Sequence, residues 1–212
     1  MRRIRILFYH AAIDGKAIDN LIAFWTGLWP SNWGTRQFSH MEIEFCDRTE
    51  LPNGEIGFST IGLDNGLCFS SATRGGKTGV RFAPSSEVLK HPERWWYLEK
   101  MLPDEIEQKM FNEASKIIGA KYDYFAILGY CAPQRILSGF LKLVGAKVAA
   151  EAIEAKLQDS KKWYCSEVVN HVLWKGSLLD KSYRWSPRAT SRLIEKMYWP
   201  LKRLSSKKVN TS

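Results

Sequence analysis

The chain lacks several features that mark large classes of proteins. No apolar stretch reaches the roughly 18 residues of a membrane-spanning helix, because Lys, Gly or Pro interrupts each one. The four cysteines include no C-x-x-C pair and have no histidine beside them at metal-ligand spacing. We therefore expect neither a zinc site nor another cofactor, and we expect free thiols in a reducing compartment.

Two further absences narrow the function. No glycine-rich loop follows a strand and opens a helix in the pattern that cradles a phosphate, and residues 74–79 are typical of a hairpin turn instead. The basic and apolar start of the chain is too short for a secretory signal and has no small-residue cleavage site before Asp14 and Lys16. These observations predict no nucleotide site, a first β-strand, and a cytoplasmic protein unless another route exports it.

The composition is typical of one domain with a full hydrophobic core and basic ends. The chain has 212 residues, of which 45% are hydrophobic and 25% charged, and this favours a single soluble domain over residues 1–200. Most of the net charge of +9 comes from the first five residues and from a basic tail over 201–212. Such ends can bind nucleic acid, anionic lipid or an acidic cell-wall polymer, but the balanced body has no basic stripe for a dedicated nucleic-acid site. The tail is predicted to be a solvated, solubilising segment.

Hydrophobic periodicity predicts an α+β fold whose first half is an antiparallel sheet. The predicted strands cover 3–9, 38–45, 55–61, 67–71, 79–82 and a segment at 95–97, and a loop covers 29–34. The predicted helices cover 14–27, 103–118, 125–128, 135–157, 165–174 and 187–197.

Cys165 is the first candidate for chemistry, because it is the first residue of a predicted helix. The unpaired N–H groups and the positive end of the helix dipole stabilise a thiolate at that position, as a nucleophile requires. A small buried cysteine beside the helix start is the plainer alternative.

His40 is the second candidate. In the strand over 38–45, Ser39 and Met41 are predicted to face the core with Ile43 and Phe45, while Phe38 and His40 face the other way with Glu42 and Glu44. A histidine on a rigid strand can take a proton from a thiol and return it to a leaving group if another group fixes its tautomer. Glu42 lies on the same predicted face and can accept the ring N–H, although a solvated charge shared with Glu44 explains it equally well.

Several segments together resemble a known family. They are Ser39 to Phe45, Cys68 to Ser71, Gly79 to Phe82 and Tyr164 to Glu167, with supporting context at 119–124 and 186–187. In order and spacing they resemble the circularly permuted NlpC-type papain-like cysteine hydrolases, the YiiX/YaeF-like group, to which lecithin:retinol acyltransferase is a more distant relative. The resemblance covers roughly residues 4 to 197.

The resemblance implies a permuted papain-like fold in which the Cys165 helix packs against the central sheet and Cys165 meets His40. It implies a cysteine peptidase or amidase that forms an acyl-enzyme on Cys165, with His40 as base and the Cys165 N–H as an oxyanion donor. Relatives place a polar residue on the strand after the His strand, which points to Ser71, next to Ser70, as an alternative orienter to Glu42.

The substrate class and the reaction stay open at this stage. A cell-wall (peptidoglycan) peptide amide is the leading substrate by resemblance, with a lipid ester or another acylated small molecule next. An acyltransferase with the same dyad and a non-catalytic binding module are the alternatives. Tyr164 and the tryptophans at 25, 29, 33, 95 and 96 are candidates to line a cleft, although core and loop anchoring explains most of them.

Overall fold

The computed structural model of the chain describes residues 1–10, 38–51, 55–58, 66–74, 77–123, 145, 162–182, 187–197 and 201–204. The helices predicted over 14–27, 125–128 and 135–157, apart from Gly145, and the loop over 29–34 lie outside the described residues. Cys131, the tryptophans at 25, 29 and 33, and the chain beyond residue 204 also lie outside them.

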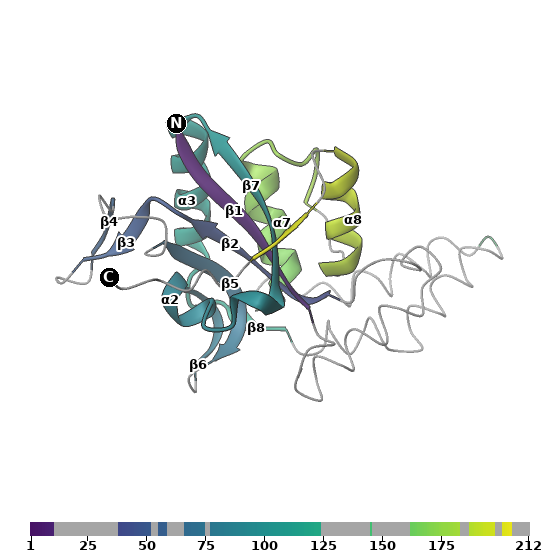
Figure 1. The fold of residues 1–212 in the computed structure, drawn as a ribbon, viewed down its shortest axis with the longest axis horizontal. Helices are drawn as coiled ribbons and strands as arrows, with labels where there is room; N and C mark the ends of the chain where they lie inside the picture. The colour runs from purple at the N-terminus through teal and green to yellow at the C-terminus, as the bar shows by residue number, and fades with distance from the viewer. Residues whose placement is uncertain are drawn as a thin grey trace, which may run out of the picture.

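A six-stranded antiparallel sheet forms the centre of the molecule (Figure 1). Its strands, in spatial order, are β10 (Lys202–Arg203), β7 (Trp95–Leu102), β1 (Arg2–His10), β2 (Phe38–Phe45), β5 (Leu67–Arg74) and β6 (Lys77–Pro84). Two small pairs accompany it: the antiparallel β3 (Arg48–Glu50) and β4 (Ile56–Phe58), and the parallel β8 (Lys121–Tyr122) and β9 (Lys162–Trp163). With its helices, the fold is α+β, as the sequence predicted.

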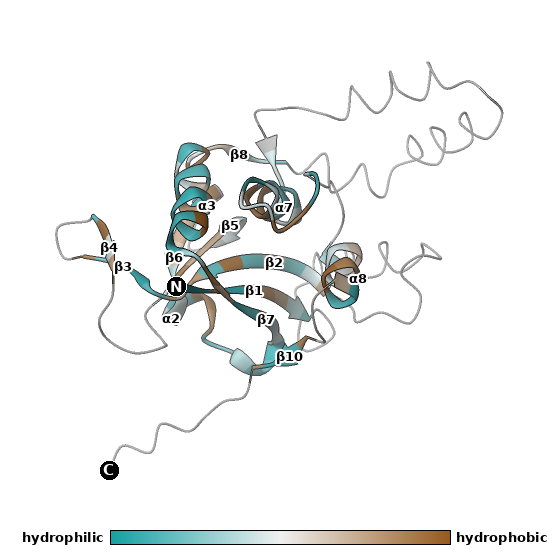
Figure 2. Cartoon of the chain, turned by 90° about the horizontal axis from the view of Figure 1, so that it is seen from above, coloured by the Kyte–Doolittle hydropathy of each residue, from teal (hydrophilic) through white to brown (hydrophobic). Residues whose placement is uncertain are grey.

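In the part of the chain that the structure describes, three helices and one short turn of helix accompany the sheet. They are α3 (Asp104–Lys116), α7 (Cys165–Lys175), α8 (Pro187–Met197) and the single turn α2 (Ser85–Val88), and a 3-10 turn covers Pro92–Arg94. Figure 2 shows α3 and α7 above one face of the sheet, with α2 on the opposite side. None of the described helices has the length and hydropathy of a membrane span.

The main core fills the space between the sheet and these helices. Its fully buried residues include Ile6 and Phe8 of β1, Ile43 of β2, and Val168 and Val172 of α7. Valines at this spacing give α7 one apolar stripe, which packs on β2 and β5. Burying such side chains contributes about 1.5 to 3 kcal/mol each, so this packing fixes where α7 begins relative to the sheet.

The opposite face of the sheet is also covered. A second cluster contains Leu7, Cys68, Val88 and Trp95, and α2 contributes its Val88. Because both faces are covered, every residue of β2 except His40 is buried. A polar side chain on this strand therefore needs a partner inside the protein.

The structure corrects several predicted boundaries. The strands at 67–71, 79–82 and 95–97 are longer than predicted, while the one at 55–61 is described only as Ile56–Phe58. Residues 201–204, predicted as tail, belong to the fold, because Leu201 is buried and β10 pairs with Tyr97 and Trp96 of β7.

The predicted alternation of β2 fails at its first residues. The register between β1 and β2 shifts after Tyr9, so that His10 pairs with Phe38. Phe38 therefore belongs to the main core and contacts Phe8 at a ring-centroid distance of 5.3 Å. An irregularity of this kind reverses which face of the sheet the side chains beyond it point to.

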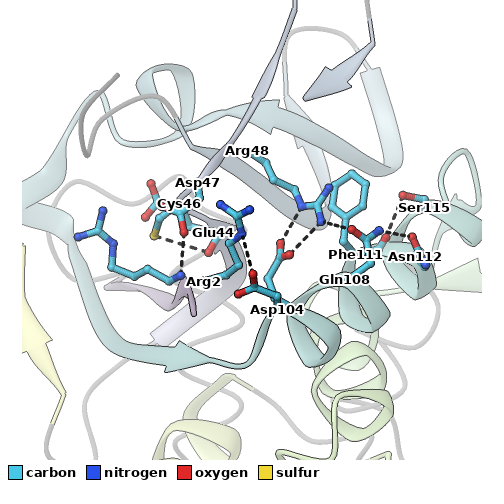
Figure 3. Close-up of polar contacts among 12 residues, drawn as sticks. Arg2, Glu44, Cys46, Asp47, Arg48, Asp104, Gln108, Phe111, Asn112 and Ser115 are labelled. Carbon is cyan, nitrogen blue, oxygen red and sulfur yellow. Dashed lines mark hydrogen bonds and ion pairs between the residues drawn. The ribbon is translucent and has the colours of Figure 1, made fainter. Parts of the chain in front are cut away.

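A buried ion pair ties the β3 strand to α3 (Figure 3). Arg48 donates to both carboxylate oxygens of Glu107, at 2.7 and 2.9 Å, and to Gln108 Oε1 at 2.9 Å. The guanidinium carbon also lies 3.7 Å from the ring centroid of Phe111. A pair this well enclosed leaves a strongly unfavourable charge behind if one partner is removed.

We expect Arg48→Met to lower the free energy of unfolding by about 3 to 5 kcal/mol, because Glu107 would stay buried without its cation. Urea denaturation followed by circular dichroism measures this loss. The matched control is Lys116→Met, which removes an exposed ion pair with Glu113 and should cost no more than about 1 kcal/mol. Equal losses of unfolding free energy in the two variants would contradict the stabilising role of the buried Arg48–Glu107 pair.

Candidate active site

Cys165 is the first residue of α7. The preceding Tyr164 is the N-cap, with an extended backbone at φ −101° and ψ 165°, and no side chain caps the helix. The N–H groups of the first turn therefore have no acceptor within the helix, and the positive end of the helix dipole lies at Cys165. The Cys165 side chain is buried, with 4% of its surface exposed.

His40 and Glu42 lie on one face of β2, two residues apart. His40 Nε2 is 3.0 Å from Glu42 Oε1, within hydrogen-bond range. The Glu42 side chain is 3% exposed and that of His40 is 15% exposed. Since Glu42 is buried, a solvated surface charge, which the sequence left open as its explanation, is excluded.

The Cys165 side chain lies close enough to the His40 ring to raise the pKa of His40 through its charge and a hydrogen bond. The contact is possible because β2 pairs with β5 only from Ile43 to Phe45, so the end of β2 that carries His40 extends beyond the paired segment. The strand and the helix start, which are 125 residues apart in the sequence, thus meet at one end of the sheet.

The surroundings of His40 favour its charged form. Burial by itself lowers the pKa of His40, but the negative charge and hydrogen bond of Cys165, together with those of Glu42, raise this pKa from 6.5 to about 10. A histidine ring that holds its proton this firmly can act as a general acid and donate the proton to a leaving group.

Glu44, two residues further along β2, has a different partner. Its Oε2 accepts a hydrogen bond from Arg5 Nη1 at 3.3 Å, and Arg5 Nε also donates to Glu99 at 2.9 Å. Burial raises the pKa of Glu44, and the Arg5 charge only partly offsets this. Glu44 is fully buried, so it does not share a solvated face with Glu42.

Ser71, the alternative orienter, contacts a different part of the site. Its hydroxyl donates to the carbonyl oxygen of Trp163 at 2.6 Å. The neighbouring Ser70 donates to the carbonyl oxygen of Met41 at 2.8 Å. The hydrogen-bonded partner that the structure gives to the His40 ring on its own strand is Glu42.

The other described cysteines and histidines differ from Cys165 and His40. Burial raises the pKa of both Cys46 and Cys68, which favours inert thiols, and these two and Cys165 are free of disulfides. His171 packs against Trp163 and Trp174, and burial lowers its pKa. Among the described side chains, no group of three or more His, Cys, Asp or Glu residues is arranged to hold a metal ion.

Trp95 is an aromatic neighbour of the site. It is 1% exposed and meets the His40 ring edge-on, with ring centroids 6.2 Å apart. It does not line an open cleft, as the sequence had left open, but belongs to the second cluster, and Trp96 packs against the main core. Tyr164 is likewise buried, at 3% exposure.

The carbonyl oxygen of Trp163 is a feature that sequence reasoning missed. It accepts hydrogen bonds from Ser71 Oγ and from the backbone N–H of Asp123, at 2.6 and 3.1 Å. Consecutive serines in an otherwise apolar strand were the available signal, because buried hydroxyls must find acceptors. Which acceptors they find depends on the register, which the sequence does not contain.

Comparison with known proteins identifies no family for this chain. No protein-family model and no curated protein sequence matches the chain.

We expect Glu42→Gln to lower the pKa of His40 below about 10, toward 6.5, because the substitution removes a negative charge next to the ring. NMR titration of the His40 ring measures the change. The control is Glu99→Gln, which removes a carboxylate that contacts Arg5 rather than His40. An unchanged His40 pKa in Glu42→Gln would refute the interaction.

The same shift predicts a pH dependence of stability. The folded-state pKa of His40 lies above its unfolded value, so the folded protein binds the proton more tightly. The contribution of His40 to stability is therefore fully present below pH 6.5 and is lost as the pH rises through about 10. Urea denaturation across this range should show a smaller loss in Glu42→Gln than in the wild type.

Proposed function

We propose that this chain is a cysteine hydrolase that cleaves an amide or ester bond through an acyl-enzyme on Cys165. The single observation that carries the proposal is the place of the His40 ring, whose Nε2 lies 3.0 Å from Glu42 Oε1 and whose pKa is raised by the adjacent Cys165. Nucleophile, base and orienter in mutual contact are the minimum set for this chemistry.

The proposed fold is a circularly permuted papain-like domain. Two features support it: the His40 strand precedes the Cys165 helix in the chain, and α7 packs against β2 and β5 of the central antiparallel sheet. A cell-wall peptide amide is the proposed substrate by resemblance, with a lipid ester next.

The reaction follows from the roles of the three side chains. The Cys165 thiolate attacks the carbonyl carbon of the substrate, a C–S bond forms, and the carbonyl oxygen becomes an oxyanion within reach of the Cys165 N–H. His40 then gives its proton to the leaving nitrogen or oxygen, the C–N or C–O bond breaks as the carbonyl re-forms, and the acyl group stays on the sulfur.

Deacylation uses the same groups in the reverse direction. Neutral His40 takes a proton from water, the resulting hydroxide attacks the thioester carbon, and the C–S bond breaks to release a carboxylic acid and restore the thiolate–imidazolium pair. Glu42 keeps the ring oriented and stabilises its positive charge in both steps.

The first test uses 4-nitrophenyl acetate as an activated ester. Wild-type protein should release a burst of 4-nitrophenolate and carry an acetyl group on Cys165, located by mass spectrometry of peptides. Cys165→Ala should abolish both, and His40→Ala should slow acylation by about 10²- to 10⁴-fold.

The matched control replaces Cys46, Cys68 and Cys131 with alanine and keeps Cys165. This variant should retain the burst and the label. Persistence of the burst in a folded Cys165→Ala protein would refute the nucleophile assignment. A wild-type protein that is never acylated would support the binding module instead.

The acyltransferase alternative shares every residue of the site and differs only in the acceptor. Adding an amine or an alcohol to the acylated protein separates the two reactions by their products. The proposal predicts the free acid as the main product at every acceptor concentration, whereas a dominant amide or ester product would favour the transferase.

A further inference from the structure

Two consecutive serines in the middle of β5 have hydroxyls that reach different parts of the candidate site. Ser70 is 3% exposed and Ser71 is fully buried. Side chains of consecutive strand residues point to opposite faces of a sheet. The two hydroxyls therefore reach different segments of the chain.

Ser70 fixes the strand that carries the base. Its hydroxyl donates to the Met41 carbonyl oxygen at 2.8 Å, and Met41 lies between His40 and Glu42. The register of β2 with β5 covers Ile43 to Phe45, so this bond joins the two strands beyond their paired segment. It holds the end of β2 at a fixed distance from β5.

Ser71 fixes the segment that carries the nucleophile. Its hydroxyl donates to the Trp163 carbonyl oxygen at 2.6 Å, and only Tyr164 separates Trp163 from Cys165. The Asp123 N–H donates to the same oxygen at 3.1 Å, and β8 pairs with β9 at Trp163. The backbone entering α7 is thus attached to β5 directly.

We infer that Ser70 and Ser71 are positioning residues that together set the separation between His40 and Cys165. This inference rests on the proposed function. The two α-carbons of the pair are about 3.8 Å apart and joined by a rigid peptide, so one short stretch of β5 holds both halves of the dyad. Neither hydroxyl touches the reacting sulfur or the imidazole, so neither residue is catalytic.

The test compares Ser70→Ala and Ser71→Ala with a matched control, Ser85→Ala. Ser85 is also buried, at 1% exposure, and its hydroxyl lies 3.5 Å from Cys68 Sγ, without contact to either member of the dyad. Each variant loses one buried, hydrogen-bonded hydroxyl, and for Ser85 the partners are Cys68 and Glu44. The three variants should therefore lose similar stability, and only the first two should disturb the site.

Two readouts separate positioning from stability. The first is the pKa of His40 by NMR, because its rise to about 10 depends on the nearby Cys165 and Glu42. We expect Ser70→Ala and Ser71→Ala to lower it by about one unit, since a looser contact weakens the coupling. The second is the rate of acylation by 4-nitrophenyl acetate, which should fall between about ten- and a hundredfold.

Ser85→Ala should leave both readouts at the wild-type level. The inference is overturned if Ser70→Ala and Ser71→Ala behave like Ser85→Ala in both. Should an alanine variant not fold, Ser70→Cys and Ser71→Cys keep the volume but offer only a weak donor, and they must still lower the His40 pKa.

The experiment distinguishes a failure of the positioning role of Ser70 and Ser71 from a failure of the proposed hydrolase function. If the wild-type protein is never acylated, the hydrolase proposal fails. The NMR titration still measures the His40–Cys165 contact in that case, and it decides whether Ser70 and Ser71 maintain it.

Discussion

The placement of one imidazole between a carboxylate and a thiol is the interaction on which the candidate site depends. His40 contacts Glu42 on its own strand and Cys165 at the start of α7. A buried cation is costly unless it is paired, so the proximity of both partners is what makes the charged ring stable there. The rest of the fold supplies that proximity: β1 fixes β2 from one side, and the apolar stripe of α7 fixes the helix against the sheet.

Two glutamates two residues apart on β2 show how the side chain that a carboxylate contacts determines its role. Glu42 and Glu44 are both buried, yet one contacts an imidazole and the other a guanidinium. Arg5 cannot give up its proton, so its pair with Glu44 has a structural role only. The imidazole can release and regain a proton, so the Glu42 pair, unlike the Glu44 pair, contains a group that can transfer one.

Much of this was predictable from the residues themselves. The strand at 38–45, the helix beginning at Cys165 and the helix at 187–197 follow from periodicity and end signals, and the structure has all three. These elements are local, and their sequence patterns are strong.

The sequence could not provide the register between distant strands or show which residues bury each face of the sheet. The shift after Tyr9 that turns Phe38 into the core depends on pairing between distant strands. The burial of Glu42 depends on the second face being covered, by residues such as Trp95 that lie far along the chain. The choice between Glu42 and Ser71 depended on these long-range facts, so it required coordinates.

The order of the elements along the chain has a consequence for synthesis. The five longer strands and α3 emerge from the ribosome before α7, so the parts of β2 and β5 that α7 covers wait for residues 165–175. At the usual pace of translation, the gap between His40 and Cys165 lasts roughly 6 to 25 seconds. During that interval the apolar side of β2 and β5 lacks the helix that covers it in the folded chain, so it can contact other apolar segments of the nascent chain.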